Sequence, residues 1–190
     1  MEFHNVLSVA SRASFREWLS LHHATESECY VLLKRGRPVD DAHFWYLDAV
    51  EEALCFGWVD STIRSVHGQN MQRFSPRRAG GTWTELNKER VRRLERLGLM
   101  TDAGRRVLPS MDLEEFRIDA GVERELRMAG VWEQFLLLPP LYQRIRASNL
   151  VFYRERYPEP YLRMLKHTIE TAREGKTFGQ WNDYGRLLEE

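Results

Sequence analysis

The sequence lacks net charge, a set of cysteines and any long apolar run, and each absence excludes a class of protein. The 28 Lys and Arg residues balance 28 Asp and Glu residues, which argues against a dedicated nucleic-acid-binding protein. The only cysteines, Cys29 and Cys55, cannot form a disulfide framework, and no clustered Cys or His spacing indicates a zinc site. We therefore expect a cytoplasmic protein with no metal or other cofactor.

The apolar residues form no stretch near the ~20 residues of a transmembrane helix. The N-terminus also lacks the basic region and apolar run of a secretion signal, so we expect no membrane insertion. The residues that are present, 43% hydrophobic and 29% charged in a chain of 190, are typical of a globular protein. This length suffices for one substantial core with a packed appendage.

Spacing along the N-terminal half predicts a small sheet with packed helices. Apolar residues three and four positions apart indicate an amphipathic helix over 44–56, and Gly57 suits its left-handed cap. Gly68 suits a hairpin turn between two strands. The strands expected from their apolar and β-branched content are 28–35, 59–66 and 70–75.

Capping patterns predict where further helices begin. Ser14 with Glu17, and Thr82 with Glu85, match the capping box in which a hydroxyl and a carboxylate satisfy the first helix amides. We therefore expect one helix from Ser14 and another over 82–97. Short helical segments are expected after Thr101 and, with Ser110 as its cap, over 112–116.

The C-terminal part has helical periodicity throughout. The helices expected there are 122–128, 131–138, 140–153 and 158–172, with prolines near the openings of the last two. The apolar side chains that should attach the C-terminal tail to the body are Phe178, Trp181, Tyr184 and Leu187. The predicted class is α+β, with a small, mainly antiparallel sheet and packed helices in 1–110 and a helical region, 111–190, packed on it.

Several short motifs resemble one known family. The motifs are Ala53–Asp60, Arg73–Arg78, Thr82-Trp-Thr with Asn87, and Gly98–Gly104. Together they resemble the YdeI/OmpD-associated proteins, also called bacteriocin-protection proteins, specifically over 48–104 and more loosely over 1–110. Gly81 departs from the serine usual in that family, and its usual C-terminal tyrosine-tryptophan motif is not recognisable here. The resemblance implies a fold and an association with envelope stress rather than a reaction.

The best candidate site is an anion pocket in the middle of the chain. Arg73, Arg77 and Arg78 come just before the expected helix start at Thr82, where guanidinium groups and unpaired amides would bind a carboxylate or phosphate. Trp58 and Trp83 could wall the pocket or belong to the core, and Asn87 joins the set through the resemblance. Alternatively, the arginines form salt bridges that attach the sheet to its helices, with Asp48, Glu52 or Asp60 as partners.

Three function classes follow from these residues. We favour a non-catalytic binding protein for a small anion, associated with stress or bacteriocin tolerance. An enzyme acting on a small anionic substrate would use Asp60 or Glu52 as acid and base, whereas Cys55 stands at a helix C-terminus, where a thiolate is disfavoured. A protein or nucleic-acid interaction module would use the basic face of the 82–97 helix. Because Glu89 and Glu95 interrupt that face, we expect no tight nucleic-acid binding.

Overall fold

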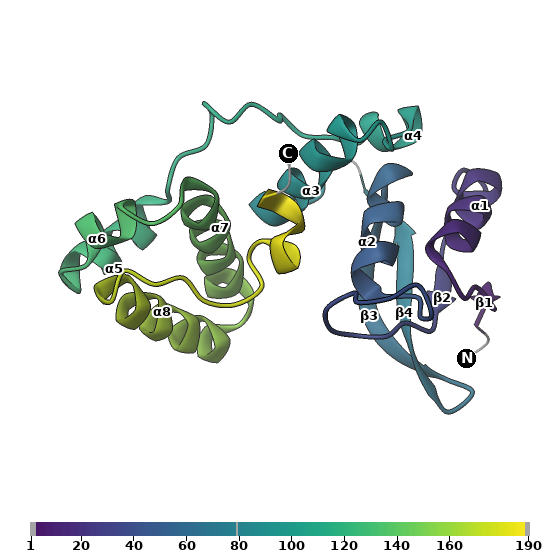
Figure 1. Ribbon diagram of the computed structural model, residues 1–190, viewed down its shortest axis with the longest axis horizontal. Coiled ribbons are helices and arrows are strands. Elements are labelled where there is room, and N and C mark those ends of the chain that lie inside the picture. Colours follow the sequence, from purple (N-terminus) through teal and green to yellow (C-terminus); the bar gives the residue numbers. More distant parts are fainter. Residues whose placement is uncertain (1–2, 79, 189–190) are drawn as a thin grey trace. The chain divides into compact units, whose positions relative to one another are not determined.

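The computed structural model describes residues 3–78 and 80–188, which form two compact units (Figure 1). The first unit contains Met1–Thr82 and Arg90–Ser110, and the second contains Trp83–Glu89 and Met111–Glu190. Helix α3, Glu85–Arg96, is therefore shared: its first residues belong to the second unit and the rest to the first. The predicted regions 1–110 and 111–190 therefore differ from this division, in which 83–89 belong to the second unit.

The first unit is built on a mixed sheet of strand order β1-β2-β4-β3. Its two-residue turn has positive φ at both His67 (48°) and Gly68 (79°), which a type I′ hairpin requires. The pairing is parallel between β1 and β2 and antiparallel between β2 and β4 and between β4 and β3. The strands are β1 Val6–Leu7, β2 Cys29–Val31, β3 Trp58–Val66 and β4 Gln69–Pro76. The predicted α+β class with a small, mainly antiparallel sheet is confirmed.

Helices α1, Arg12–His22, and α2, Tyr46–Cys55, cover one face of this sheet (Figure 1). Phe15 of α1 packs against Phe74 of β4 with ring centroids 5.4 Å apart, and both side chains are fully buried. At the end of α2, Gly57 has φ 74°, as its predicted capping role requires.

Three local predictions are wrong, for identifiable reasons. Strand β2 ends at Val31 because the chain then turns toward α2, where the Lys34 amide donates to the Phe44 carbonyl. Helix α1 begins before Ser14, since Ser11 is its N-cap and Ser14 only completes that capping box. Residues 112–116 form a turn rather than a helix.

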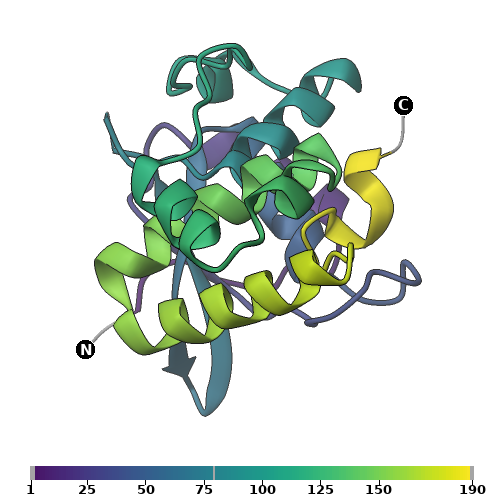
Figure 2. The same ribbon diagram turned by 90° about the vertical axis from the view of Figure 1, so that its left-hand side faces the viewer.

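The second unit is helical, as expected, and Figure 2 looks onto it. Helices α7 and α8 meet at Tyr157 and pack together, and each opens on a proline whose missing amide costs nothing there. The helices are α5 Ala120–Met128, α6 Trp132–Leu136, α7 Pro140–Arg156 and α8 Pro158–Arg173, followed by the short η1 Asp183–Leu188. Residues at the centre of its core are Leu126, Phe135, Tyr142 and Leu150.

The C-terminal tail is attached to this helical core, which confirms the prediction made for it. The Trp181 ring meets the Tyr142 ring edge-on at 5.5 Å. The Arg146 guanidinium lies 3.7 Å from the centroid of the Phe178 ring and donates to the Phe178 carbonyl at 2.7 Å. Leu187 is buried. Within the described residues, no helix has the length and apolar character needed to cross a membrane.

We expect Gly104→Ala to destabilise the first unit. Helix α4, Asp102–Arg105, packs so closely on the end of α2 that a Cβ at Gly104 would lie 2.3 Å from the Cys55 carbonyl oxygen. Overpacking of this kind should lower the free energy of unfolding by about 3 kcal/mol, measured by urea denaturation.

Gly98→Ala is the control for this substitution. Gly98 has φ 66° and open space around the added methyl group, so only the left-handed backbone opposes alanine, at about 1 kcal/mol. Equal losses in the two variants would show that the close approach of α4 to α2 contributes nothing.

Candidate functional site

Asp60 and Tyr46 form the centre of a polar cluster on the helix-covered face of the sheet. Asp60 lies opposite Phe74 in the β3–β4 ladder and therefore points to the same face. Its carboxylate accepts a 2.6 Å hydrogen bond from the Tyr46 hydroxyl. Burial and the Asp60 charge raise the pKa of Tyr46, so the tyrosine stays protonated and keeps donating.

Arg35 lies over the Tyr46 ring of this pair. Its guanidinium carbon is 3.8 Å from the centroid of the Tyr46 ring, and its Nη2 donates to the Gln72 side-chain oxygen at 2.5 Å. The Gln72 amide nitrogen in turn donates to the Ser61 carbonyl at 3.0 Å. Stacking on Tyr46 and the hydrogen bond to Gln72 thus fix the planar guanidinium of Arg35. Arg35 stands in the segment that follows the end of β2 at Val31.

Arg77 approaches the same cluster from the end of β4. Its amide donates to the Gly57 carbonyl at 2.9 Å, and its Nη1 donates to the Thr82 carbonyl at 3.3 Å. Burial lowers the pKa of Arg77 to about 10, against the opposing effect of the Asp60 charge. The structure therefore brings Arg77 and Asp60, both expected in the site, into one neighbourhood.

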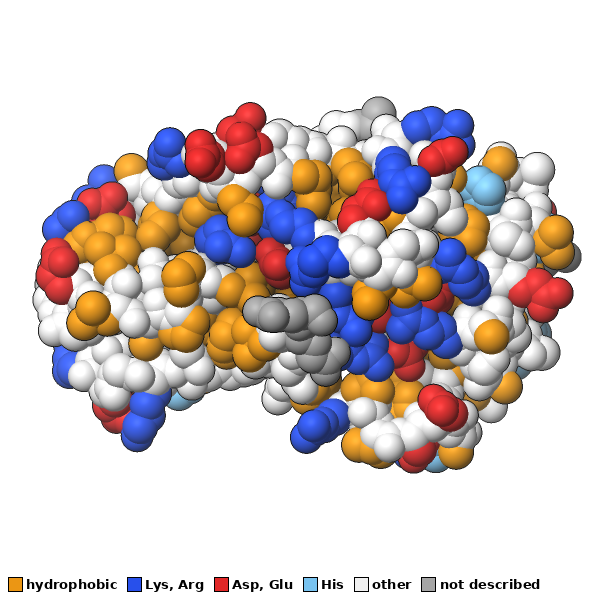
Figure 3. Space-filling model, turned by 45° about the horizontal axis from the view of Figure 1, so that its top comes forward, with side chains coloured by type: hydrophobic (Ala, Val, Ile, Leu, Met, Phe, Trp, Pro, Cys, Tyr) orange, Lys and Arg blue, Asp and Glu red, His pale blue; other side chains and the backbone are white. Residues whose placement is uncertain are grey.

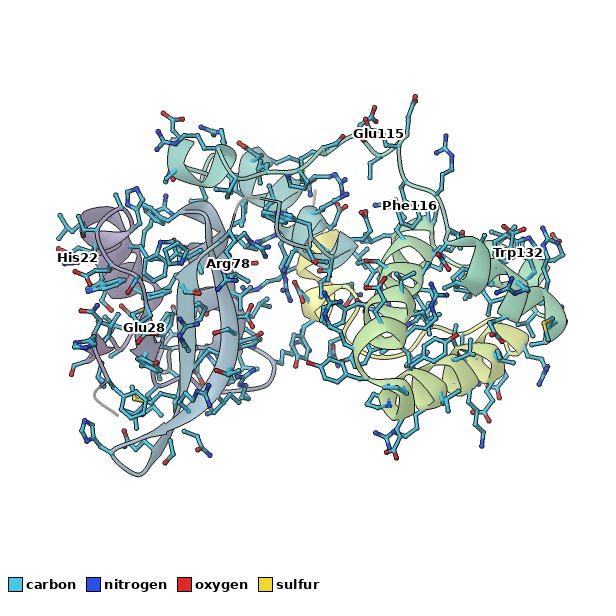
Figure 4. The ribbon with its side chains drawn as sticks, turned by 180° about the vertical axis from the view of Figure 1, so that it is seen from behind. His22, Glu28, Arg78, Glu115, Phe116 and Trp132 are labelled. Atoms are coloured by element: carbon cyan, nitrogen blue, oxygen red, sulfur yellow. The ribbon has the colours of Figure 1, made fainter. Side chains whose placement is uncertain are left out.

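Arg73 and Arg78 do not join Arg77. Arg73 is adjacent to Phe74 and points to the opposite face of the sheet, where its Nε pairs with Glu28 at 2.6 Å. Arg78 is exposed beyond the end of β4 (Figure 4). The predicted pocket of three arginines is not assembled, because Glu28 holds Arg73 on the opposite face, while Arg77 and Arg78 follow the end of β4 at Pro76.

The expected helix start at Thr82 is also wrong. Helix α3 begins at Glu85, and the Thr84 hydroxyl accepts from the Asn87 amide at 3.3 Å. The Glu85 amide donates to the Ser148 hydroxyl at 3.1 Å within the second unit. The Thr84 and Ser148 hydroxyls thus accept from two of the backbone amides that were predicted to bind an anion. Thr82 lies in the first unit, while Trp83 and Asn87 lie in the second.

Trp58 belongs to the core rather than to a pocket wall. It is 1% exposed, its indole nitrogen donates to the His23 carbonyl at 3.1 Å, and its ring meets Trp18 edge-on at 5.7 Å. Of the two interpretations of Trp58, pocket wall or core residue, the structure therefore shows the core residue.

Glu52 belongs to a buried charge network on the other side of α2. Glu51 and Glu52 are 0% and 1% exposed. Arg12 donates to both, at 2.7 Å and 2.5 Å; Arg16 donates to Glu52 at 2.7 Å, and Arg93 to Glu51 at 3.1 Å. Burial lowers the pKa of Arg12, but the two glutamates outweigh it and the pKa is raised overall.

This network removes Glu52 from acid and base chemistry. Both of its oxygens accept hydrogen bonds from guanidinium groups, whereas Asp60 bonds to Tyr46, so the two acids share no partner. No group of three His, Cys, Asp or Glu residues that could hold a metal ion exists in the described part of the chain.

Ion pairs offset part of the basic charge of α3, and acidic residues interrupt its basic face. Arg93 pairs with Glu51, and the acidic residue Glu95 pairs with Arg105 at 2.8 Å. On the face shown in Figure 3, acidic side chains lie among the basic ones. Alternating charges of this kind weaken the long-range attraction to a phosphate backbone.

We expect Glu52→Ala to lower the free energy of unfolding by about 3 kcal/mol, since it leaves two partly buried guanidinium groups without their shared carboxylate. Glu95→Ala is the matched control: its pair with Arg105 is solvent-exposed and should be worth less than about 1 kcal/mol. Urea denaturation measures both. A small loss in Glu52→Ala would mean that the network does not hold the unit together.

We expect Cys55 to be chemically quiet. It is fully buried, and burial, followed by the charge of Glu52, raises its pKa to about 11. In a Cys29→Ser background, a thiol reagent at neutral pH should label Cys55 only as fast as the protein unfolds. Rapid labelling that does not depend on denaturant would contradict this.

The same shift predicts alkaline instability. Because the folded-state pKa of Cys55 exceeds its ordinary value of 9.0, the associated stability is complete below pH 9 and is lost as the pH rises toward 11. The decline should be shallower in Cys55→Ala than in the parent protein.

Comparison with known protein families gives a match over the N-terminal part of the chain. Residues 7–107 match a family described as a domain of unknown function, DUF8412. No curated protein and no solved structure matches the chain. The matched span contains Arg35, Tyr46, Asp60 and Arg77, and it is more than half of the 190 residues. The chain therefore belongs to the DUF8412 family.

Proposed function

We propose that the protein is a non-catalytic binding protein that recognises a small anion through Arg35. The observation that supports this most directly is the fixed guanidinium of Arg35, which is stacked on Tyr46 and held by Gln72. Among residues 3–78 and 80–188, no carboxylate forms an ion pair with it. A carboxylate or phosphate group supplies the planar, bidentate partner that such a guanidinium prefers.

Preorganisation is what distinguishes Arg35 from an ordinary surface arginine. A mobile arginine loses side-chain entropy when it binds a ligand, at about 0.5–1.5 kcal/mol. Arg35 has already lost that freedom, because the Tyr46 ring below it is itself fixed by Asp60. The cluster therefore holds the cation in place before any ligand arrives.

Arg77 supports the same proposal as the second cation of the cluster. It is half-buried, and a charge in a partly desolvated position interacts more strongly with a neighbouring anion than an exposed charge does. Asp60 connects the two arginines: it accepts the hydrogen bond from Tyr46, on which Arg35 stacks, and its charge acts on Arg77.

The geometry supports binding over catalysis. The raised pKa of Tyr46 makes it a poor proton donor near neutral pH, and Glu52 is held by two arginines. The cellular part of the proposal, a cytoplasmic protein of the YdeI/OmpD-associated type that acts in stress or bacteriocin tolerance, is supported by the motifs in 48–104 and by two reduced, buried cysteines.

A thermal-shift screen of small carboxylates and phosphates, each matched to chloride at equal ionic strength, tests the binding. A ligand at ~100 times its dissociation constant adds ~2.7 kcal/mol to stability, which is a shift of several degrees. We expect the stabilising ligand to lose at least tenfold in affinity for Arg35→Gln.

Arg64→Gln is the control for this variant. Arg64 is another exposed arginine, on β3, so the change in net charge is identical. Full affinity in Arg64→Gln would confirm that Arg35 acts by its position. Equal affinity in both variants, or no ligand that stabilises the parent protein, would contradict the proposal.

A further inference from the structure

The second unit contains a pocket of its own. It is separate from the cluster of Arg35, Tyr46, Asp60 and Arg77 in the first unit, called here the Arg35 cluster. Its volume is about 400 Å³, within the range of small-molecule sites. Residues 116–118, which follow the turn, line one side, and residues of helices α5, α6 and α7 line the rest. Apolar walls come from Phe116, Ile118, Trp132 and Pro140. Phe116 lies in the segment before α5, and Trp132 lies at the start of α6 (Figure 4).

The aromatic wall at Trp132 is held in place by its neighbours. The Arg127 guanidinium lies 4.9 Å from the centroid of the indole ring, and Arg127 pairs with Glu123 of the pocket lining at 2.8 Å. The Phe135 ring, which is fully buried, lies nearly parallel to the indole at 6.3 Å. A fixed aromatic surface of this kind favours a flat ring in the pocket.

Two polar groups of the lining are already committed to the protein. Gln143 donates its amide nitrogen to the Leu136 and Leu138 carbonyls, at 2.9 Å and 2.6 Å, so its side-chain oxygen remains as an acceptor. Arg144 donates to Glu89 at 3.2 Å, and this pair offsets its charge.

Arg117 is different from Arg144. Its Nη1 donates to the main-chain carbonyls of Phe116, at 2.8 Å, and of Glu114. The side chain is exposed, and no carboxylate in the described part of the chain lies within ion-pair distance of it. Its guanidinium is thus positioned by its own turn while its charge is not offset, which is the arrangement that attracts an anionic group.

We propose that this pocket binds a small planar aromatic molecule that carries one carboxylate. The ring lies against Phe116 and Trp132, the carboxylate pairs with Arg117, and a donor group on the ring reaches the Gln143 oxygen. This site does not depend on the Arg35 cluster, which belongs to the other unit, and the two sites take different ligands: a small anion there and an aromatic acid here.

The probe for this pocket is 2-naphthoate, compared with the uncharged 2-naphthamide of the same shape. Binding to the full chain is followed by ¹H–¹⁵N NMR, in which the assigned indole N–H of Trp132 reports on the wall directly. We expect 2-naphthoate to shift that signal with a millimolar or lower dissociation constant, and the amide to bind at least tenfold more weakly.

Two variants separate the charge from the fold. Arg117→Gln should weaken 2-naphthoate binding at least tenfold while leaving the amide unchanged. Arg163→Gln, an exposed arginine on α8, makes the same change in charge and should have no effect. The proposal is overturned if the acid and the amide bind equally, if Arg117→Gln binds the acid normally, or if neither probe shifts Trp132.

Discussion

Two adjacent buried carboxylates, Glu51 and Glu52, are the constraint on which the first unit depends. Removing a carboxylate from water costs several kcal/mol unless opposite charge and hydrogen bonds replace the solvent, and two neighbours also repel each other. Every one of their four oxygens accepts a hydrogen bond from Arg12, Arg16 or Arg93. Helix α2 is therefore stable here only when α1 and the second part of α3 deliver these arginines, so three helices must assemble together.

This constraint also positions the candidate site. Helix α2 carries the glutamates on one side and Tyr46 on another, and Tyr46 reaches the sheet through Asp60. The charge network sets the rotation of the helix, and that rotation places Tyr46 under Arg35. The charge network and the Arg35 cluster thus use two different sides of the same helix.

The sequence predicts features that depend on neighbours along the chain. The prolines that open α7 and α8, the hairpin glycine Gly68 and the cap at Gly57 all act locally, and all lie where they were expected. It does not predict Arg35, whose role depends on the early end of β2, or the separation of Arg73 from Arg77, which depends on a pairing with Glu28. One signal was available for the network: Glu51 follows Leu47 by four residues and precedes Leu54 by three, on the apolar stripe.

The shared helix α3 affects how the chain folds as it is synthesised. The chain passes from the first unit to the second at 82–83, returns at 89–90 and leaves again at 110–111. A ribosome releases the residues of the first unit, including Arg93, well before the helices that cover 83–89 exist. Until α7 is synthesised, the start of α3 lacks the Ser148 hydroxyl that accepts from the Glu85 amide and the Arg144 side chain that pairs with Glu89, and fragments that end near residue 110 lack both.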